Sequence, residues 1–210
     1  MRGRRVQVSE NALLDAARHV LLREGAAATT AAIARRAGVS EALVFYRHKT
    51  KEGLIAAVLE REMFPPPRLA EIAGAAGGGN LLELVCELGE ELLAFVRATL
   101  PFLEIVRTLP DAEAMMRTAA SRGATPERLV AALAEYFQAE IRAGRLRPVD
   151  PRILARALYG AVLDRVHSQR LPGRRPPIED DAAFVRALAD LLLHGAIRPL
   201  PRAGRGPARR

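Results

Sequence analysis

The sequence is poor in several residue types that would indicate particular classes of protein. Its 210 residues include one cysteine, no tryptophan and only 4% aromatic residues. A single cysteine excludes an internal disulfide framework, and the apolar neighbours of Cys86 indicate a small buried side chain rather than a redox sensor. No apolar run approaches the roughly 20 residues that a membrane-spanning helix needs, and charges soon interrupt the basic N-terminal stretch, so no signal-peptide core is present. We therefore expect a cytoplasmic protein with no membrane partner.

Patterns typical of catalytic and metal sites are also absent. The four histidines are dispersed, and the sequence contains no HExxH, no Cys/His cluster and no GxSxG motif. The glycine triplet 77–79 is interpreted as a loop, since no phosphate-loop pattern accompanies it. Asp164 and His167 share a helix face and offer a metal pair, although an ordinary polar contact is the simpler interpretation. We expect no catalytic residue, no cofactor and no metal.

Apolar residues recur every three to four positions along the chain, whereas alternation with period two is scarce. This spacing predicts an all-α protein of about nine helices. Local residue signals predict where each helix begins and ends: Ser, Thr, Asp or Asn before a helix, and Gly or Pro after it. These signals place helices at 9–24, 30–37, 41–47, 51–63, from 80 to a break at Pro101, at 101–109, 111–121, 126–143, 151–168 and 179–194.

Positive charge is concentrated at the two ends of the chain. Residues 1–51 contain ten Arg or Lys against four acidic residues, and residues 196–210 contain five Arg and no acidic residue. A basic N-terminal third is the electrostatic signature of a polyanionic partner such as DNA. The alternative is a solvated basic surface in an Arg-rich chain. The last segment, 198–210, is rich in Pro, Gly and Arg, which predicts a disordered basic tail.

Residues 29–54, TTAAIARRAGVSEALVFYRHKTKEGL, have the pattern of a helix-turn-helix motif. Thr29 or Thr30 can cap the first helix, Gly38 suits a turn with positive φ, and Ser40 can cap the second helix. In such a motif the second helix enters the major groove of DNA and the first lies across the backbone. An ordinary helical hairpin with a Gly-Val-Ser turn is the alternative.

The same residues resemble the TetR family of bacterial transcriptional regulators. The resemblance is specific over residues 9–60 and architectural beyond residue 64. It rests on the following residues: Thr29-Thr30, Ile33-Ala34, Ala37-Gly38-Val39-Ser40, Phe45-Tyr46, Lys49-Thr50-Lys51-Glu52 and Leu54. It implies a three-helix DNA-binding domain at 1–50, an effector-binding and dimerisation domain at 51–197, and the tail at 198–210. It also implies a homodimer that joins through the last two helices.

The expected contacts with double-stranded DNA fall into two groups. Phosphate contacts are expected from helix N-termini and from basic or phenolic side chains: Arg4, Arg5, Thr29, Thr30, Ser40, Tyr46, Lys49 and Lys51. Contacts with base edges or thymine methyl groups are expected from Glu41, Ala42, Phe45 and Arg47. Core packing is the alternative for Phe45 or Tyr46. The family usually has His then Phe where this chain has Arg47 then His48, so His48 is expected to be a partly buried structural imidazole rather than a pH or metal switch.

Methionine and aromatic residues in the middle of the chain predict a pocket between helices for an apolar or amphipathic effector. The candidate lining residues are Phe64, Leu88, Leu92, Phe102, Met115, Met116, Phe137, Tyr159 and Leu163, and ordinary core packing is the alternative for each. Candidate groups for orienting an effector head group are Arg97, Glu104, Arg107 and Asp164. The expected dimer interface comprises Ala157, Gly160, Ala161, Phe184, Leu188 and Leu191.

Taken with the resemblance, these features predict a ligand-responsive regulator. We expect a repressor that the effector releases from a palindromic operator. The alternatives are a helical scaffold protein that uses its basic face on an acidic partner, and an enzyme or carrier built on a helical bundle. Sequence-specific binding of duplex DNA would distinguish the first hypothesis from the other two.

Overall fold

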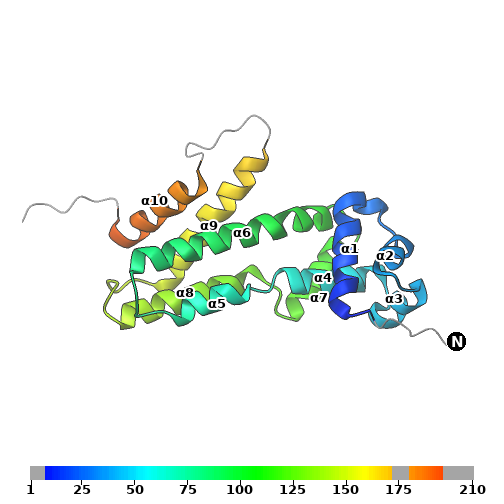
Figure 1. Ribbon diagram of the computed structural model, residues 1–210, viewed down its shortest axis with the longest axis horizontal. Coiled ribbons are helices and arrows are strands. Elements are labelled where there is room, and N and C mark those ends of the chain that lie inside the picture. The colour runs from blue at the N-terminus through cyan, green and yellow to red at the C-terminus, as the bar shows by residue number, and fades with distance from the viewer. Residues whose placement is uncertain (1–7, 172–179, 196–210) are drawn as a thin grey trace, which may run out of the picture.

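The computed structural model describes residues 8–171 and 180–195. Every regular element in these ranges is helical, which confirms the all-α prediction, and the molecule is elongated (Figure 1). The α-helices are α1 Glu10–Glu24, α2 Thr30–Ala37, α3 Glu41–His48, α4 Lys51–Glu62, α5 Pro67–Gly74, α6 Leu81–Arg107, α7 Ala112–Ser121, α8 Pro126–Arg142, α9 Pro151–Arg170 and α10 Asp181–His194, with a 3₁₀ turn at Gly25–Ala27. Arg4, Arg5 and the segment 198–210 lie outside the described residues.

Side-chain caps begin the helices where the sequence predicted them. The hydroxyls of Ser9, Thr29, Ser40 and Thr50 each accept a hydrogen bond from the backbone N–H three residues later. Each cap satisfies a donor that the first turn of a helix leaves unpaired. Gly38 ends α2 in the left-handed conformation, at φ 70°. A residue with a Cβ is strained at this φ, which explains the glycine in the helix-turn-helix turn.

The prediction of a helix break at Pro101 was wrong, because α6 continues through this residue to Arg107. Proline removes one backbone donor and crowds the preceding turn, which normally ends or kinks a helix. Here packing on both sides of the proline holds the helix together, because Leu100 belongs to one core and Phe102 and Val106 belong to the other. A further short helix, α5, was not expected from the sequence, and it brings the described residues to ten α-helices.

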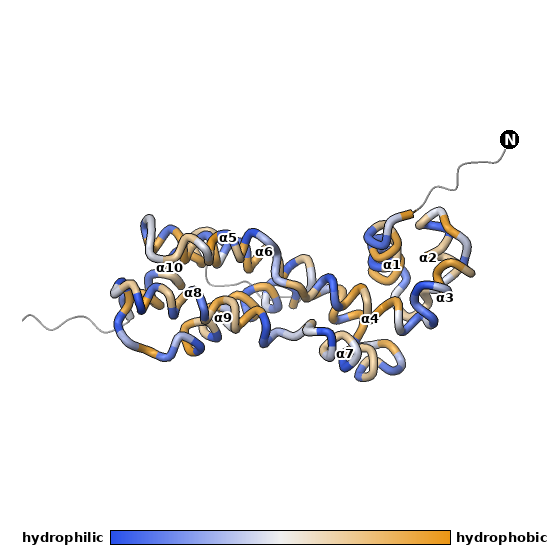
Figure 2. Tube along the Cα trace, turned by 90° about the horizontal axis from the view of Figure 1, so that it is seen from below, coloured by the Kyte–Doolittle hydropathy of each residue, from blue (hydrophilic) through white to orange (hydrophobic). Residues whose placement is uncertain are grey.

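Two hydrophobic cores lie at opposite ends of the molecule. One core joins α1–α4 with α7 and the C-terminal part of α6, and the other joins α5, α8, α9 and α10 with the N-terminal part of α6. Figure 2 shows α4 extending from the three N-terminal helices, with α7 beside it. Leu54, Ile55 and Val58 of α4 belong to the same core as Leu13 and Ile33. The expected boundary between residues 50 and 51 therefore falls within a continuous core. No helix in the described ranges is long and apolar enough to span a membrane.

Candidate DNA-binding face and effector cavity

Helices α2 and α3 form the helix-turn-helix, and their exposed side chains define the candidate DNA-binding face. Ile33 and Val44 are buried and hold the two helices against α1 and α4. On the outer side Tyr46 is 75% exposed and Phe45 is 43% exposed, so neither aromatic ring is a core residue. Exposed aromatic rings on this short helix are available for phosphate or thymine-methyl contacts.

Lysine and hydroxyl groups lie at the edges of this face. Lys49 Nζ donates to Tyr46 O at 3.1 Å and lies 5.4 Å from the centre of the Tyr46 ring. Lys51 Nζ lies 3.5 Å from Ala26 O, beside the N-terminal end of α2. The Thr29 and Ser40 hydroxyls accept from Ala32 N and Leu43 N, so their own protons remain available to an oxyanion.

Glu41 lies nearer to α2 than the sequence suggested. Its carboxylate accepts a hydrogen bond from the Thr30 hydroxyl, linking the first turn of α3 to the first turn of α2. Two of the residues predicted to contact DNA are therefore already bonded to each other in the free protein. Ala42 is exposed beside them.

Arg47 does not occupy the exposed face in this structure, and this differs from the predicted base contact. Arg47 Nη2 donates to Val8 O at 3.0 Å, and Nη1 lies 3.3 Å from Glu10 Oε2. The guanidinium group is therefore directed toward the start of α1. His48 is the largely buried imidazole that the sequence analysis favoured, and its side chain is 9% exposed. No feature of the α3 sequence itself distinguishes an arginine that faces α1 from one that faces DNA.

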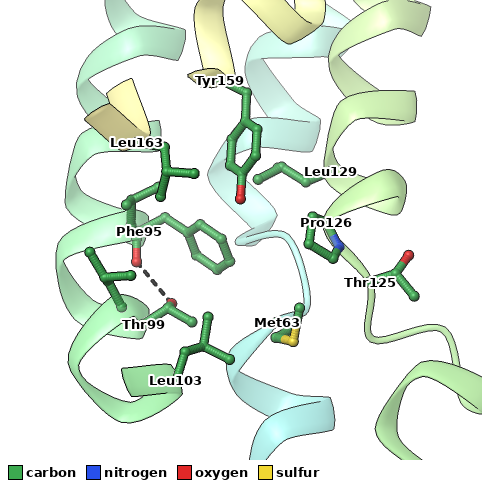
Figure 3. A pocket seen from close by; sticks show the side chains of 11 residues that line it. Met63, Phe95, Thr99, Leu103, Thr125, Pro126, Leu129, Tyr159 and Leu163 are labelled. Carbon is green, nitrogen blue, oxygen red and sulfur yellow. Dashed lines mark hydrogen bonds between the residues drawn. The ribbon is translucent and has the colours of Figure 1, made fainter. Parts of the chain in front are cut away.

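A cavity of about 590 Å³ lies at the junction of the two cores. Leu59 and Met63 of α4, Leu103 of α6, and Tyr159 and Leu163 of α9 line it. A narrower apolar extension, lined by Phe95, Val96 and Leu129, continues inward from these residues (Figure 3). The Tyr159 hydroxyl points into this space and makes no hydrogen bond with another described residue (Figure 3). Burial, together with the nearby Glu127 carboxylate, raises the pKa of Tyr159, so the hydroxyl remains a neutral donor.

Charged groups and a histidine lie at the rim of the cavity, where the side chains are exposed. They are Arg107, Arg117, Glu127, Asp164 and His167. Arg107 and Asp164, two of the four groups predicted to orient a head group, are among them. The other two have partners elsewhere: Arg97 pairs with Asp181, and Glu104 pairs with Arg170.

Three of the nine predicted pocket residues line this cavity, namely Met116, Tyr159 and Leu163. Phe64 and Leu88 line separate depressions. The remaining four are buried core residues that line neither lobe of the cavity: Leu92, Phe102, Met115 and Phe137. The sequence analysis missed Met63, Leu100 and Leu103. The expected break at Pro101 separated Leu100 from Leu103 and concealed their common helix face.

The residues of the expected dimer interface lie on α9 and α10. Ala157, Gly160 and Leu191 are exposed, and Leu191 is 50% exposed. Ala161, Phe184 and Leu188 are half-buried, because they also pack within the chain. Exposed apolar surface on two adjacent helices is the kind of surface that a partner covers.

Solved structures of bacterial regulators have the same fold. One is described as a TetR-family transcriptional regulator from Mesorhizobium loti, with 19% identity, a TM-score of 0.66, and coverage of 87% of this chain and 92% of that chain. Another is the transcriptional regulator FadR from Bacillus subtilis, in complex with stearoyl-CoA, with 16% identity, a TM-score of 0.63, and coverage of 90% and 100%. A third is NalD from Pseudomonas aeruginosa, the secondary repressor of the MexAB-OprM multidrug efflux pump, with 22% identity, a TM-score of 0.59, and coverage of 90% and 98%.

Family models match both parts of the chain. Residues 13–58 match the model of bacterial regulatory proteins of the tetR family, and residues 90–194 match the C-terminal domain of AefR-like transcriptional repressors. A comparison with curated proteins gave no match. The second model alone covers half of the chain, and the first covers the helix-turn-helix described above. This protein belongs to the TetR family of bacterial transcriptional regulators.

Proposed function

We propose that this protein acts in the bacterial cytoplasm as a homodimeric repressor that an apolar or amphipathic small molecule releases from a palindromic operator. The observation that carries this proposal is the position of the cavity between the two cores. Leu59 of α4 belongs to the core of the DNA-binding helices, and it also lines the cavity. A molecule that enters the cavity therefore contacts the helix on which α2 and α3 are mounted.

The coupling follows from differential binding. Met116 and Ala119 of α7 line one side of the cavity, and Tyr159 and Leu163 of α9 line the other. Because α7 packs on α4, an effector that separates α7 from α9 displaces the helix-turn-helix. An effector that binds better to the displaced arrangement must lower the affinity for DNA by the same factor, since coupling between two sites is reciprocal.

The distribution of polar groups favours an amphipathic effector. The inner lobe is apolar and narrow, whereas charged side chains of both signs surround the opening. An elongated apolar chain fits the inner lobe, and a polar head group would meet Arg107 and Asp164 at the rim. The B. subtilis regulator was solved with stearoyl-CoA, which has this construction, but its 16% identity relates it to this chain by fold alone.

Two recognition helices are required to read a palindrome, and α9 and α10 supply the surface that we assign to dimerisation. Leu191→Arg places a charge on an exposed position, so the monomer should still fold, while the dimer would have to bury that charge. Sedimentation velocity should therefore give a monomer for this variant. A stable Leu191→Arg dimer would move the interface to another surface.

The function is tested by footprinting on DNA upstream of the protein's own coding region. We expect a protected site with two-fold symmetry and half-sites about one helical turn, or a multiple of it, apart. Binding that depends on salt but not on sequence would favour the scaffold hypothesis instead. An asymmetric protected site would contradict the dimeric mode of recognition.

The effector site is tested by filling the cavity. Leu163→Trp places a larger side chain in the cavity. Leu171→Trp, directly after the end of the same helix, is the matched control outside the cavity. Long-chain acids, alcohols and cationic amphiphiles of equal chain length are screened by thermal shift and then for operator release. We expect Leu163→Trp to bind operator normally and to be insensitive to the effector. If the variant responds like the wild type, the effector binds elsewhere.

A further inference from the structure

The last turn of the recognition helix α3 is fastened to the first turn of α1 by a single carboxylate. Glu10 Oε2 lies 3.3 Å from Arg47 Nη1, and Glu10 Oε1 lies 2.9 Å from His48 Nε2. Arg47 Nη2 adds a hydrogen bond of 3.0 Å to Val8 O, just before α1 begins. We refer to Glu10, Arg47 and His48 together as the α1–α3 clamp.

The clamp is needed because apolar contacts hold α3 at one point. Of the eight residues of α3, Val44 alone belongs to the hydrophobic core. One buried side chain determines the distance of a helix from its neighbours but leaves its rotation about its own axis weakly restrained. The Thr30–Glu41 hydrogen bond restrains the first turn of α3. Arg47 and His48 are three and four residues beyond Val44, so their contacts with Glu10 restrain the last turn on an adjacent part of the helix surface.

The environment of His48 allows the clamp to form without a charged imidazole. Burial is the largest influence on His48 and lowers its pKa below the ordinary value, although the Glu10 carboxylate opposes this effect. At neutral pH the ring is therefore neutral, and its buried Nε2 lies beside Glu10 Oε1 without hydrogen-bond geometry. Glu10 is half exposed, accepts a hydrogen bond from Arg47 through one oxygen and contacts His48 through the other.

We propose that Glu10 is a positioning residue for operator recognition, which sets the rotation of α3 through Arg47 and His48 and keeps Arg47 away from the DNA bases. This inference rests on the proposed DNA-binding function. It assigns a role in specificity to an acidic residue on a surface that must approach a polyanion. The alternative is that Arg47 leaves Glu10 on binding and contacts DNA directly.

The sign of the effect of removing Glu10 separates positioning from simple electrostatics. Loss of an acidic residue near DNA should strengthen binding to every duplex. Loss of a positioning residue should instead weaken binding to the operator while leaving non-specific binding unchanged or stronger. Asp15→Ala is the matched control, because Asp15 also lies on α1 and pairs with an arginine, but that arginine is Arg61 of α4, at 2.8 Å, rather than a residue of α3.

Operator and scrambled duplexes are titrated with the wild type, Glu10→Ala and Asp15→Ala at one salt concentration. We expect Glu10→Ala to weaken operator binding by about threefold to tenfold, which corresponds to the net loss of one ordinary intramolecular hydrogen bond. Asp15→Ala should bind the operator as well as the wild type or better. Equal strengthening of operator binding by both variants, or an operator affinity in Glu10→Ala equal to that of the wild type, would overturn the positioning role.

Two further measurements test the inference, one by rescue of operator binding and one on the free protein. Glu10→Ala/His48→Phe should recover operator binding, because Leu14 and Ala57 border the same depression and can pack against an apolar ring without Glu10. Hydrogen exchange of residues 41–48 in the free protein should accelerate in Glu10→Ala and not in Asp15→Ala. If protection of α3 is the same in Glu10→Ala as in the wild type, the clamp is refuted, whether or not the wild type binds a specific operator. If protection of α3 depends on Glu10 but the wild type binds no specific operator, only the proposed function is refuted.

Discussion

Gly53→Ala is expected to damage both stability and DNA binding, although a Gly-to-Ala change inside a helix normally helps. Gly53 lies in the first turn of α4, and a Cβ at this position would be 2.3 Å from His48 O, a backbone atom. The same carbonyl accepts from Thr50 N at 2.8 Å in the turn that joins α3 to α4. Lys49 in this turn has a φ of 66°, so the connection is already tightly constrained.

The magnitude follows from two opposing effects. Alanine is favoured over glycine in a helix interior by about 1 kcal/mol. An ordinary contact between carbon and oxygen is well beyond 3 Å, so the backbone of α3 or α4 must move by roughly 1 Å, and overpacking of this kind costs about 1–3 kcal/mol. We expect a net destabilisation of up to about 2 kcal/mol, with α3 displaced relative to α4.

Urea unfolding and operator titration measure the two consequences. Gly74→Ala is the control, because a Cβ there would meet no atom within 4 Å. The control should keep wild-type affinity and equal or slightly greater stability. If Gly53→Ala were stabilised by the full helix-propensity gain and bound the operator normally, the close approach of α4 to His48 would have no energetic importance.

Three other predictions concern separate parts of the molecule. Gly89→Ala should destabilise the contact of α6 with α10, because a Cβ would lie 2.7 Å from Val185 Cγ1, and Val185→Ala should partly rescue it in a double-mutant cycle of urea unfolding; additive effects would contradict this. Burial tends to raise the pKa of Asp181, but hydrogen bonds from Arg165, Arg97 and Gln169 outweigh it and lower the pKa. The stabilisation by these bonds is therefore present at neutral pH and is lost as pH falls below the ordinary Asp range. Asp181→Asn should reduce the pH dependence of the melting temperature at acidic pH, and an unchanged profile would contradict this. Lys51→Ala should lower the slope of log affinity against log salt by about one without changing base preference; a changed preference would show that Lys51 reads bases.

Local chemistry made much of the fold predictable from the sequence. Hydroxyl caps at Ser9, Ser40 and Thr50 and the glycine at residue 38 act within a few residues, so their effect can be recognised without tertiary contacts. Pro101 was misinterpreted because its consequence depends on tertiary packing, in which Phe102 and Val106 join a core formed by helices distant in sequence.

The candidate sites were less predictable, because periodicity identifies a buried face but not what the face covers. Phe102 and Phe137 have the same helical spacing as cavity residues, yet each packs inside a core. Arg47 similarly is a residue type that often contacts DNA, but its guanidinium group donates to Glu10, 37 positions away, and is directed toward α1. Both distinctions depend on pairs of helices whose relative placement the sequence alone does not reveal.

The shared helix α6 has a consequence for attempts to recombine this regulator with its relatives. At 27 residues it is roughly 40 Å long, and its C-terminal part supplies Phe102 and Val106 to the core of the DNA-binding helices. A chimera joined at residue 50 would replace these side chains with those of another protein. The transplanted DNA-binding helices would then lose the α6 residues that complete their hydrophobic core. The exchangeable unit is therefore discontinuous: it needs α1–α4 together with the end of α6 and α7, and a sensor grafted from another protein must be inserted between them.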